Sequence, residues 1–310
     1  MAANSLLKQY SEERAALVQN AVPRAAAIIL GRRRVLSGIR WRDDLIVTAA
    51  EAIGGAEQVD VRLEGDELEA QVVATDLTTD IAILRVGAAG GGASTATSTL
   101  APTASASAQL LRVGETIAVV GRTLRGPAAI WGTVQLAGPA WSSRRGGKID
   151  QRLELDVSFD PTFEGAAVID TNGNVVAMAV PGPYHRVLGI PATTIETVVA
   201  KVDQFGHLPK PYIGIRLQPL WLDDDTRTKL GRKSRGIAAV GGVDAGSPAD
   251  QAHIELGDLL LTLDSEPAES VNGMARRIAS TTPGQIIALE VLRGGKPLTI
   301  NVQIGERPRH

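Results

Sequence analysis

The strongest constraint on the fold is an alternation of apolar and polar residues with a period of two, in short segments from Ala25 onward. The segments at residues 59–63 and 68–72 flank Glu64-Gly65-Asp66, a sequence typical of a hairpin turn. A second hairpin is predicted where Arg293-Gly294-Gly295-Lys296 separates the last two alternating segments. Many short strands joined by glycine-rich turns indicate a barrel or a sandwich. Because aromatic residues make up only 3% of the chain, its cores must consist of Val, Ile, Leu and Ala.

Two segments have the spacing of helices instead. Apolar residues recur three and four apart between Leu6 and Val18, with Ser5 as a candidate N-cap and Pro23 as the end. This N-terminal helix either packs on its own domain or forms an oligomer contact. A second helix is predicted from Ser270 to Ser280, ahead of Pro283-Gly284.

The length of 310 residues fits two or three domains. A break is predicted where Gly206, Pro209 and Pro211 occur close together. We therefore expect a helical segment at 1–24, a β domain at 25–207 and a smaller domain at 208–306. Residues 87–108 contain little besides Gly, Ala, Ser and Thr, a composition typical of a flexible loop.

Composition excludes several classes of protein. A net charge of −2 argues against a broad basic face for nucleic acid or for membrane lipids. The absence of cysteine excludes disulfides, Cys–zinc sites and a thiol nucleophile. The first twenty residues lack the pattern of a signal peptide, and the nearby apolar stretch Ala25–Leu30 is too short to span a membrane. We therefore expect a soluble, cytoplasmic protein without a membrane span, although a chain trimmed of a leader would look the same.

Several segments, taken in order, resemble the HtrA-type serine proteases, which have a trypsin fold and a C-terminal PDZ domain. The resemblance runs from about Ala25 to Ile304, and its specificity comes from the order and spacing of the segments. These are Ser37–Ala50, Thr79–Leu84, Asp160–Val168, Pro211–Ile215, Gly246–Ala249 and Leu256–Asp258. The resemblance implies a mostly β chain with a double β-barrel followed by a PDZ domain.

The sequence departs from this family at the residues that carry the chemistry. Glu51 stands at the position of the catalytic histidine and Glu164 at that of the serine, while Asp80 keeps the aspartate. An ionised glutamate is too weak a base, and a carboxylate is a poor nucleophile toward an amide. In the oxyanion loop Thr162 replaces a glycine, and Phe163 is expected to crowd a polar pocket. We therefore expect an inactive pseudoprotease with no cofactor.

Three alternatives accompany this interpretation. Glu51, Asp80 and Glu164, with His185 nearby, could form a carboxylate-lined metal or acid–base site in the cleft between the barrels. The two glutamates could instead be solvated or pair with arginines. A residual protease could use another serine, such as Ser158. The basic runs Arg32-Arg33-Arg34 and Arg144-Arg145 are expected to be solvated loops.

The PDZ resemblance implies a groove for peptide C-termini. Tyr212-Ile213-Gly214 would bind the peptide carboxylate, and Ile215 and Leu217 would begin the strand that pairs with the peptide. The helix side of the groove would be formed by Val271, Met274, Ala275 and Ile278. Ile278 is expected to be a core residue instead, and Met274 is equally compatible with both roles.

Together these observations favour protein binding over catalysis. The chain is expected to act as a scaffold, an adaptor or a chaperone-like subunit. By resemblance its partners are proteins or peptide C-termini, and it assembles as a homotrimer or in a hetero-complex.

Overall fold

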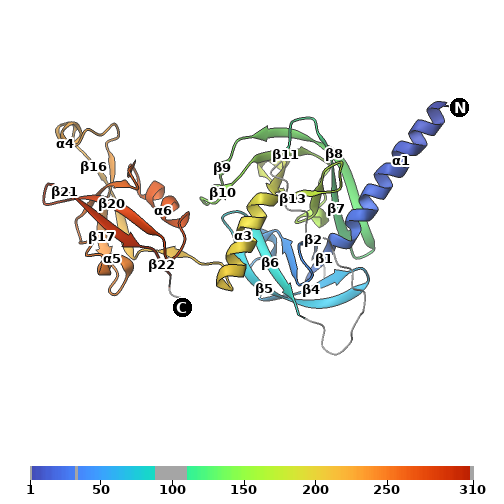
Figure 1. Cartoon of the computed structure of the whole chain (residues 1–310), viewed down its shortest axis with the longest axis horizontal. Coiled ribbons are helices and arrows are strands. Elements are labelled where there is room, and N and C mark those ends of the chain that lie inside the picture. The colour runs from blue at the N-terminus through green and yellow to red at the C-terminus, as the bar shows by residue number, and fades with distance from the viewer. Residues whose placement is uncertain (1, 32–33, 88–109, 308–310) are drawn as a thin grey trace. The chain divides into compact units, whose positions relative to one another are not determined.

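The computed structural model describes residues 2–31, 34–87 and 110–307, so the predicted loop at 87–108 lies outside the described residues except for Gly87. The chain divides into two compact units, Met1–Leu208 and Pro209–His310 (Figure 1). The fold is mostly β, as the alternation predicts: two six-stranded barrels are followed by a PDZ fold.

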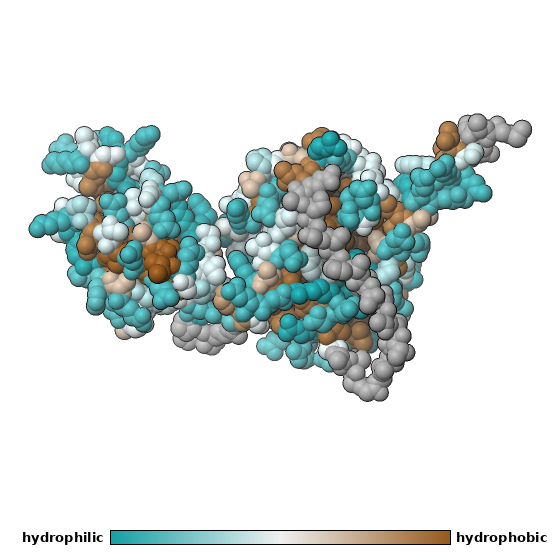
Figure 2. Space-filling model, in the orientation of Figure 1, coloured by the Kyte–Doolittle hydropathy of each residue, from teal (hydrophilic) through white to brown (hydrophobic). Residues whose placement is uncertain are grey.

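The N-terminal helix α1 runs from Ala2 to Ala21, and a single 3-10 turn, η1, follows at Val22–Arg24. Because the helix begins at Ala2, Ser5 lies inside it and the prediction of Ser5 as the N-cap is wrong. Leu17 and Val18 pack against the core of the first unit. The N-terminal part of the helix instead exposes Leu6, Leu7 and Tyr10, and a hydrophobic patch near this end is visible in Figure 2.

The first barrel contains six antiparallel strands in the closed order β1-β2-β3-β6-β5-β4. Their bounds are β1 Ala25–Leu30, β2 Arg34–Arg40, β3 Leu45–Thr48, β4 Gln58–Leu63, β5 Asp66–Asp76 and β6 Ile81–Val86. The predicted first hairpin is confirmed as β4–β5, with a two-residue turn at Glu64 and Gly65 because Asp66 already belongs to β5. Both turn residues have positive φ, at 46° and 111°, as a tight hairpin turn requires.

The second barrel closes in the order β11-β14-β13-β12-β7-β8. Its strands are β7 Thr116–Thr123, β8 Gly126–Gly138, β11 Arg152–Asp156, β12 Ala167–Ile169, β13 Val175–Pro181 and β14 Val187–Pro191. The remaining elements of this unit are short strands and helices. They are β9 Trp141–Ser142, β10 Lys148–Ile149, α2 Ala50–Ile53, η2 Pro161–Phe163, η3 Pro183–His185 and α3 Ala192–Phe205.

The cores are aliphatic, as the composition predicts. Among the buried hydrophobic side chains of the described residues, only Trp41 and Phe163 are aromatic. Full burial of one branched aliphatic side chain stabilises the folded state by roughly 1.5–3 kcal/mol. The two barrels therefore need no large aromatic centre.

Ser37 on β2 joins the two barrels. Its N–H donates to the Glu164 carbonyl oxygen at 3.0 Å, and its hydroxyl donates to the Thr162 carbonyl oxygen at 2.7 Å. The same hydroxyl accepts the Arg122 N–H of β7 at 3.1 Å. The serine is only 1% exposed, so these bonds form away from water.

The second unit is built on one antiparallel sheet in the order β16-β17-β18-β20-β21, with β19 paired to β18. Its elements are β15 Pro211–Tyr212, β16 Ile215–Trp221, α4 Asp224–Lys229, β17 Gly236–Val243, α5 Pro248–Gln251, β18 Leu259–Leu263, β19 Glu266–Pro267, α6 Val271–Ala279, β20 Ile286–Arg293, β21 Lys296–Gln303 and β22 Gly305–Glu306. The second predicted hairpin is confirmed as β20–β21. The second predicted helix is α6, whose Ser270 hydroxyl accepts the Gly273 N–H as an N-cap.

A glycine pair tests the junction between the barrels. Gly165 and Gly173 have nearly the same φ, at 85° and 84°, so alanine is strained at both positions. A Cβ at Gly165 would also collide with the Ser37 carbonyl oxygen and the Thr48 hydroxyl, whereas a Cβ at Gly173 meets nothing within 4 Å. Gly165→Ala should therefore destabilise the first unit by several kcal/mol and Gly173→Ala by about 1 kcal/mol in urea titrations. Equal losses would contradict this packing.

Candidate functional site

Glu51, Asp80 and Glu164 come from three separate segments of the first unit and lie close enough for their charges to interact. Glu51 is in the first turn of α2, and Asp80 ends the turn between β5 and β6 with a φ of 60°. Glu164 follows η2 directly. The Asp80 carboxylate accepts the Glu51 N–H at 2.8 Å, which fixes these two segments together.

Each glutamate is paired with an arginine. Arg34 Nη2 lies 3.4 Å from Glu164 Oε2, and Arg145 Nη1 lies 3.1 Å from Glu51 Oε1. Both guanidinium groups also donate to carbonyl oxygens, of Ala52 and Leu77 respectively. The expectation of a solvated loop is wrong for Arg34, which begins β2, and Arg32 and Arg33 lie outside the described residues. Arg145 does lie in an exposed turn, but its charge, like that of Arg34, neutralises a glutamate.

Burial changes the acidity of two of the carboxyl groups. Burial is the main cause that raises the pKa of Asp80 to about 6; the Glu51 N–H opposes this shift, and the charges of Glu51 and Glu164 contribute to it. Burial also raises the pKa of Glu164, against the lowering effect of Arg34. The side chain of Glu164 is only 10% exposed, so this carboxylate is a desolvated charge held by one arginine.

The loop from Asp160 to Glu164 uses its own backbone donors. The Thr162 N–H donates to the Asp160 carboxylate at 2.8 Å, and the Glu164 N–H donates to the Pro161 carbonyl oxygen at 3.2 Å. The Thr162 hydroxyl donates to the same Asp160 carboxylate at 2.7 Å, and these bonds lower the pKa of Asp160. The N–H groups of residues 162 and 164 are therefore occupied within the loop.

The structure corrects the expectation for Phe163. This side chain is 8% exposed and packs in the aliphatic core of the second barrel. Because η2 turns it inward, it does not crowd a polar pocket. Its packing instead anchors the loop in its present conformation.

His185 is exposed and lies in η3, the turn between β13 and β14, with a φ of 58°. No group of three or more His, Asp or Glu side chains among the described residues could hold a metal ion. The predicted metal site at Glu51, Asp80, Glu164 and His185 therefore lacks a suitable arrangement. Ser158, the alternative nucleophile, is exposed and has no hydrogen bond with a histidine within the described ranges.

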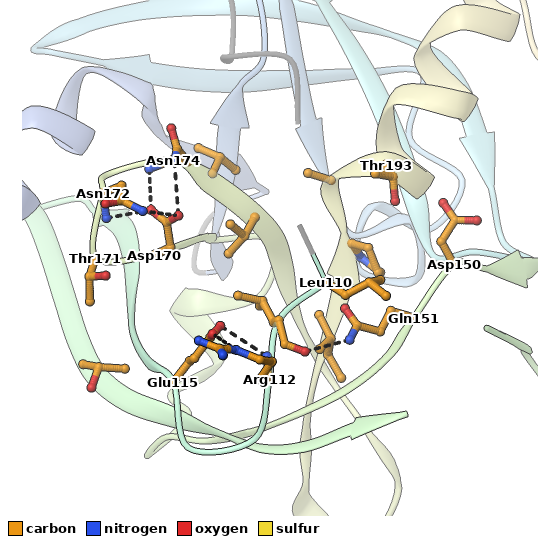
Figure 3. A pocket seen from close by; sticks show the side chains of 17 residues that line it. Leu110, Arg112, Glu115, Asp150, Gln151, Asp170, Thr171, Asn172, Asn174 and Thr193 are labelled. Carbon is orange, nitrogen blue, oxygen red and sulfur yellow. Dashed lines mark hydrogen bonds and ion pairs between the residues drawn. The ribbon is translucent and has the colours of Figure 1, made fainter. Parts of the chain in front are cut away.

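A pocket of about 510 Å³ opens at the other end of the second barrel (Figure 3). It is lined by Thr116, at the start of β7, whereas Arg122, near the other end of this strand, contacts Ser37. Several of its polar side chains are already hydrogen-bonded: Asp170 accepts both the backbone N–H and the side-chain amide of Asn172 and of Asn174. This pocket contains none of the three cleft carboxylates.

In the second unit, the connection between β15 and β16 has unused donors. The Ile213 carbonyl oxygen accepts the Ala249 N–H and the Gly214 carbonyl oxygen accepts the Asp244 N–H. The N–H groups of Ile213 and Gly214 have no hydrogen-bond partner among the described residues. Gly214 has a φ of 82°, and a Cβ there would collide with Ser247. The Tyr212 hydroxyl donates to Asp244 at 2.7 Å, which holds the connection from the other side.

The predicted groove residues divide into two sets. Ile215, Leu217 and Val271 are partly buried and pack against the core of the second unit, while Ala275 on α6 is exposed. Met274 and Ile278 are 1% and 9% exposed. Both are therefore core residues. For Met274, which was compatible with either role, burial favours the core over the groove, and for Ile278 it agrees with the expected core role.

Comparison with known proteins assigns both units. The family model of the trypsin-like peptidase domain matches residues 36–178, and that of the PDZ domain matches residues 211–304. A solved structure described as the HtrA-type protease AlgW with a decapeptide has a TM-score of 0.65 and 21% identity, covering 96% of this chain and 99% of that one. The serine endoprotease from Yersinia pestis has a TM-score of 0.64 and 24% identity, covering 94% and 97%.

Curated relatives agree with this assignment. A probable periplasmic serine endoprotease, DegP-like, of Rhizobium meliloti is 29% identical over 79% of this chain and 47% of its own length. The periplasmic pH-dependent serine endoprotease DegQ of Escherichia coli is 28% identical over 84% of this chain and 56% of its own length. The chain spans about half the length of the curated relatives it matches.

The chain thus combines a trypsin-like peptidase domain with a PDZ domain. In this combination and order the chain is similar to HtrA- and DegP-like proteases. Within residues 2–31, 34–87 and 110–307, no helix has both the length and the hydrophobicity needed to cross a membrane. The periplasmic names of the relatives do not support the cytoplasmic location expected from the sequence.

The raised pKa of Asp80 predicts a pH dependence of stability. The folded protein holds this proton up to about pH 6, whereas an unfolded aspartate loses it near its ordinary value of 3.8. The free energy of unfolding should therefore fall as the pH rises from about 4 to about 6. Asp80→Asn removes the ionisable group and therefore this loss of stability, while the amide oxygen can still accept the Glu51 N–H. We expect a gain of about 1–2 kcal/mol at pH 7.5, after allowance for solvent screening.

Thermal unfolding of the wild type and of Asp80→Asn between pH 4 and pH 8 measures this effect. Asp66→Asn, at an exposed position at the start of β5, is the control and should follow the wild type. A wild type and an Asp80→Asn variant with the same pH profile would contradict the assignment.

Proposed function

We propose that this HtrA-like protein is proteolytically inactive and acts as a protein-binding scaffold, adaptor or chaperone-like subunit. The observation that carries the proposal is the state of the loop at 160–164. Its carboxylate at Glu164 is paired with Arg34, and the N–H groups of Thr162 and Glu164 are bonded within the loop.

The chemistry of peptide hydrolysis explains why these features matter. In a trypsin-like site, a histidine removes the proton of a serine, and two backbone N–H groups stabilise the oxyanion. Glu51 and Glu164 provide neither the base nor the nucleophile, and a negative Glu164 would repel the developing oxyanion. Loss of the serine or the histidine alone lowers the rate on the order of 10⁶-fold in serine proteases.

Restoring the family's residues in two steps distinguishes the effect of the missing catalytic side chains from the effect of the loop conformation. We expect no covalent labelling of the wild type by a fluorophosphonate probe, and slow labelling of Glu51→His/Glu164→Ser. Adding Asp160→Asn, Thr162→Gly and Phe163→Asn should release the loop donors. Because one oxyanion donor changes rates about 10²- to 10³-fold, the five-residue variant should label faster by at least that factor.

Glu164→Ser alone is the matched control, since it has the nucleophile without the base. Labelling is read by intact-protein mass spectrometry, with circular dichroism to verify folding. Labelling of the wild type, or equal rates for the two-residue and five-residue variants, would be incompatible with an occupied oxyanion loop.

The binding role is proposed for the PDZ domain, with peptide C-termini as ligands. Support comes from the unpaired N–H groups of Ile213 and Gly214, which suit a carboxylate, and from the adjacent edge strand β16. The similar fold of AlgW, which was solved with a decapeptide, supports the same role. Ile215, Leu217, Val271 and Ala275 would contact the peptide side chains.

Peptide binding predicts dependence on the free carboxylate. A peptide with an apolar last residue should bind at least about tenfold more tightly as the free acid than as the amide, because charge-assisted hydrogen bonds are lost in the amide. Gly214→Ala should abolish binding through its collision with Ser247. Gly246→Ala, with a φ of 72° and open space around the new Cβ, should retain it. Fluorescence anisotropy measures both comparisons, and equal affinity for acid and amide would exclude this mode of binding.

Assembly is the remaining part of the proposal. The exposed Leu6, Leu7 and Tyr10 on α1 suit a homotrimer or a hetero-complex with an active relative. Sedimentation of the purified chain and a pull-down followed by mass spectrometry distinguish the two. The relatives' names favour the periplasm as the compartment, and cell fractionation tests that placement.

A further inference from the structure

The strand β16 has an edge that is free among the described residues, because it ends the order of its sheet. Two backbone hydrogen bonds, one beyond each end of β16, determine which residues face that edge. The Leu222 N–H donates to the Arg235 carbonyl oxygen at 2.8 Å, and the Asp244 N–H donates to the Gly214 carbonyl oxygen at 2.9 Å. Along an antiparallel ladder, every second residue of a strand is hydrogen-bonded to its neighbour. Both bonds place the even-numbered residues of β16 in the set that bonds to β17. The backbone groups facing the free edge therefore belong to Ile215, Leu217, Pro219 and Trp221.

Proline interrupts this row of donors. Pro219 has no N–H, so the free edge offers donors at Ile215, Leu217 and Trp221 and only a carbonyl oxygen between the last two. An extended chain added to this edge would form complete backbone hydrogen bonding opposite Ile215 and Leu217. It would bond only to the carbonyl oxygen of Pro219, and would be fully hydrogen-bonded again opposite Trp221.

The same four residues share one face of the strand, since side chains alternate with a period of two. On the opposite face, Arg216 and Gln218 lie over Gly242 and Gly241, where any Cβ would collide with them. Ile215 and Leu217 are partly buried against the core, whereas Trp221 is 80% exposed. The apolar row therefore continues beyond the residues of the proposed peptide groove and ends in an exposed indole ring.

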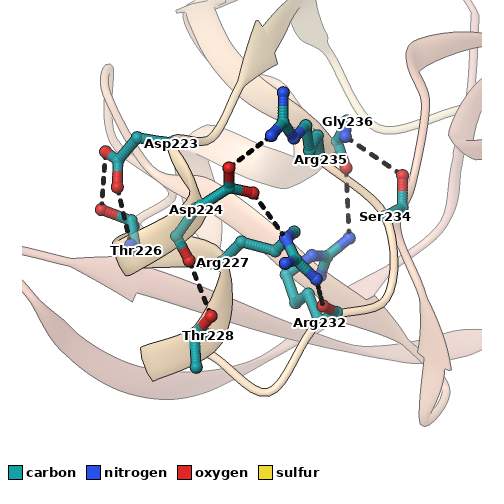
Figure 4. A network of polar contacts seen from close by, with 9 residues as sticks. All are labelled: Asp223, Asp224, Thr226, Arg227, Thr228, Arg232, Ser234, Arg235 and Gly236. Carbon is teal, nitrogen blue, oxygen red and sulfur yellow. Dashed lines mark hydrogen bonds and ion pairs between the residues drawn. The ribbon is translucent and has the colours of Figure 1, made fainter.

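A polar network follows Trp221 in the chain and joins Asp223 and Asp224 to residues 226–236 (Figure 4). Asp223 caps α4 by accepting the Thr226 N–H at 2.7 Å, and Asp224 pairs with both Arg227 and Arg235. Arg235 is the residue whose carbonyl oxygen binds Leu222, next to Trp221. The strand end is therefore held in place before any ligand arrives.

We propose that Trp221 is a second specificity-determining residue for an extended peptide with a free C-terminus. This inference rests on the proposed peptide-binding function. A ligand whose carboxylate is held by Ile213 and Gly214 places its last residue, counted as zero, opposite Ile215. Antiparallel pairing then places residue −2 opposite Leu217, residue −4 opposite Pro219 and residue −6 opposite Trp221. An apolar or aromatic side chain at −6 packs on the indole ring, and the residue at −4 contributes little.

Two eight-residue, fluorescein-labelled peptides test this register on the full chain. They share an apolar last residue and differ only at −6, where one has phenylalanine and the other alanine. We expect the phenylalanine peptide to bind about five- to tenfold more tightly to the wild type, as aromatic packing provides. Trp221→Ala should abolish this difference without changing the affinity of the alanine peptide by more than about twofold.

Leu220→Ala is the matched control, because this neighbouring side chain is 44% exposed and lies on the other face of β16. It should keep the preference for phenylalanine. Pro219→Ala restores an N–H opposite −4 and should tighten both peptides by about two- to fivefold.

The two proposals fail in different ways. If neither peptide binds, or if the amidated peptides bind as tightly as the acids, the peptide-binding function itself is wrong. If the acids bind but phenylalanine and alanine at −6 are equivalent, or if Leu220→Ala removes the preference as completely as Trp221→Ala, the role of Trp221 is overturned.

Discussion

The arrangement of the two barrels around Glu51, Asp80 and Glu164 depends on the buried hydrogen bonds of Ser37. Through its N–H and hydroxyl this residue binds the carbonyl oxygens of Glu164 and Thr162, and it also accepts the Arg122 N–H of the second barrel. Each such bond contributes about 1 kcal/mol, and breaking one leaves a buried polar group without a partner. Gly165 must lack a side chain to allow this approach. The position of the loop at 160–164 is thus set by the junction between the barrels.

Given this position, the changes in the loop are consistent with one another. The Asp160 carboxylate accepts hydrogen bonds from the N–H and the hydroxyl of Thr162, and the Phe163 side chain packs in the core of the second barrel. The backbone can therefore close on itself, and no donor at 162 or 164 remains for a substrate oxygen. The buried Glu164 carboxylate is stabilised by its ion pair with Arg34, so the acidic side chain is tolerated at the position that we propose corresponds to the serine of an active protease.

Period-two alternation and turn residues were sufficient to predict both hairpins and the β class, because these signals are local. Glycine and proline spacing is an equally local signal, and it predicts a domain break at about residue 208. Pairing of Glu51 and Glu164 with arginines was one of the alternatives from sequence, but the particular arginines could not be predicted, since Arg145 and Arg34 approach from segments distant in sequence. The inward turn of Phe163 and the burial of Met274 also depend on tertiary packing. The edge role of Pro219 becomes visible only once the hydrogen-bond phase of β16 is known.

The most direct test of this account is peptide-bond cleavage by the purified protein. Unfolded casein is incubated with the wild type and with Glu164→Ala at equal, high concentrations, and new termini are identified by mass spectrometry. The account predicts that both samples give the same background, attributable to trace contaminants. Cleavage that is present in the wild type and absent from Glu164→Ala would show that the acidic residue takes part in hydrolysis, and the central claim would be wrong.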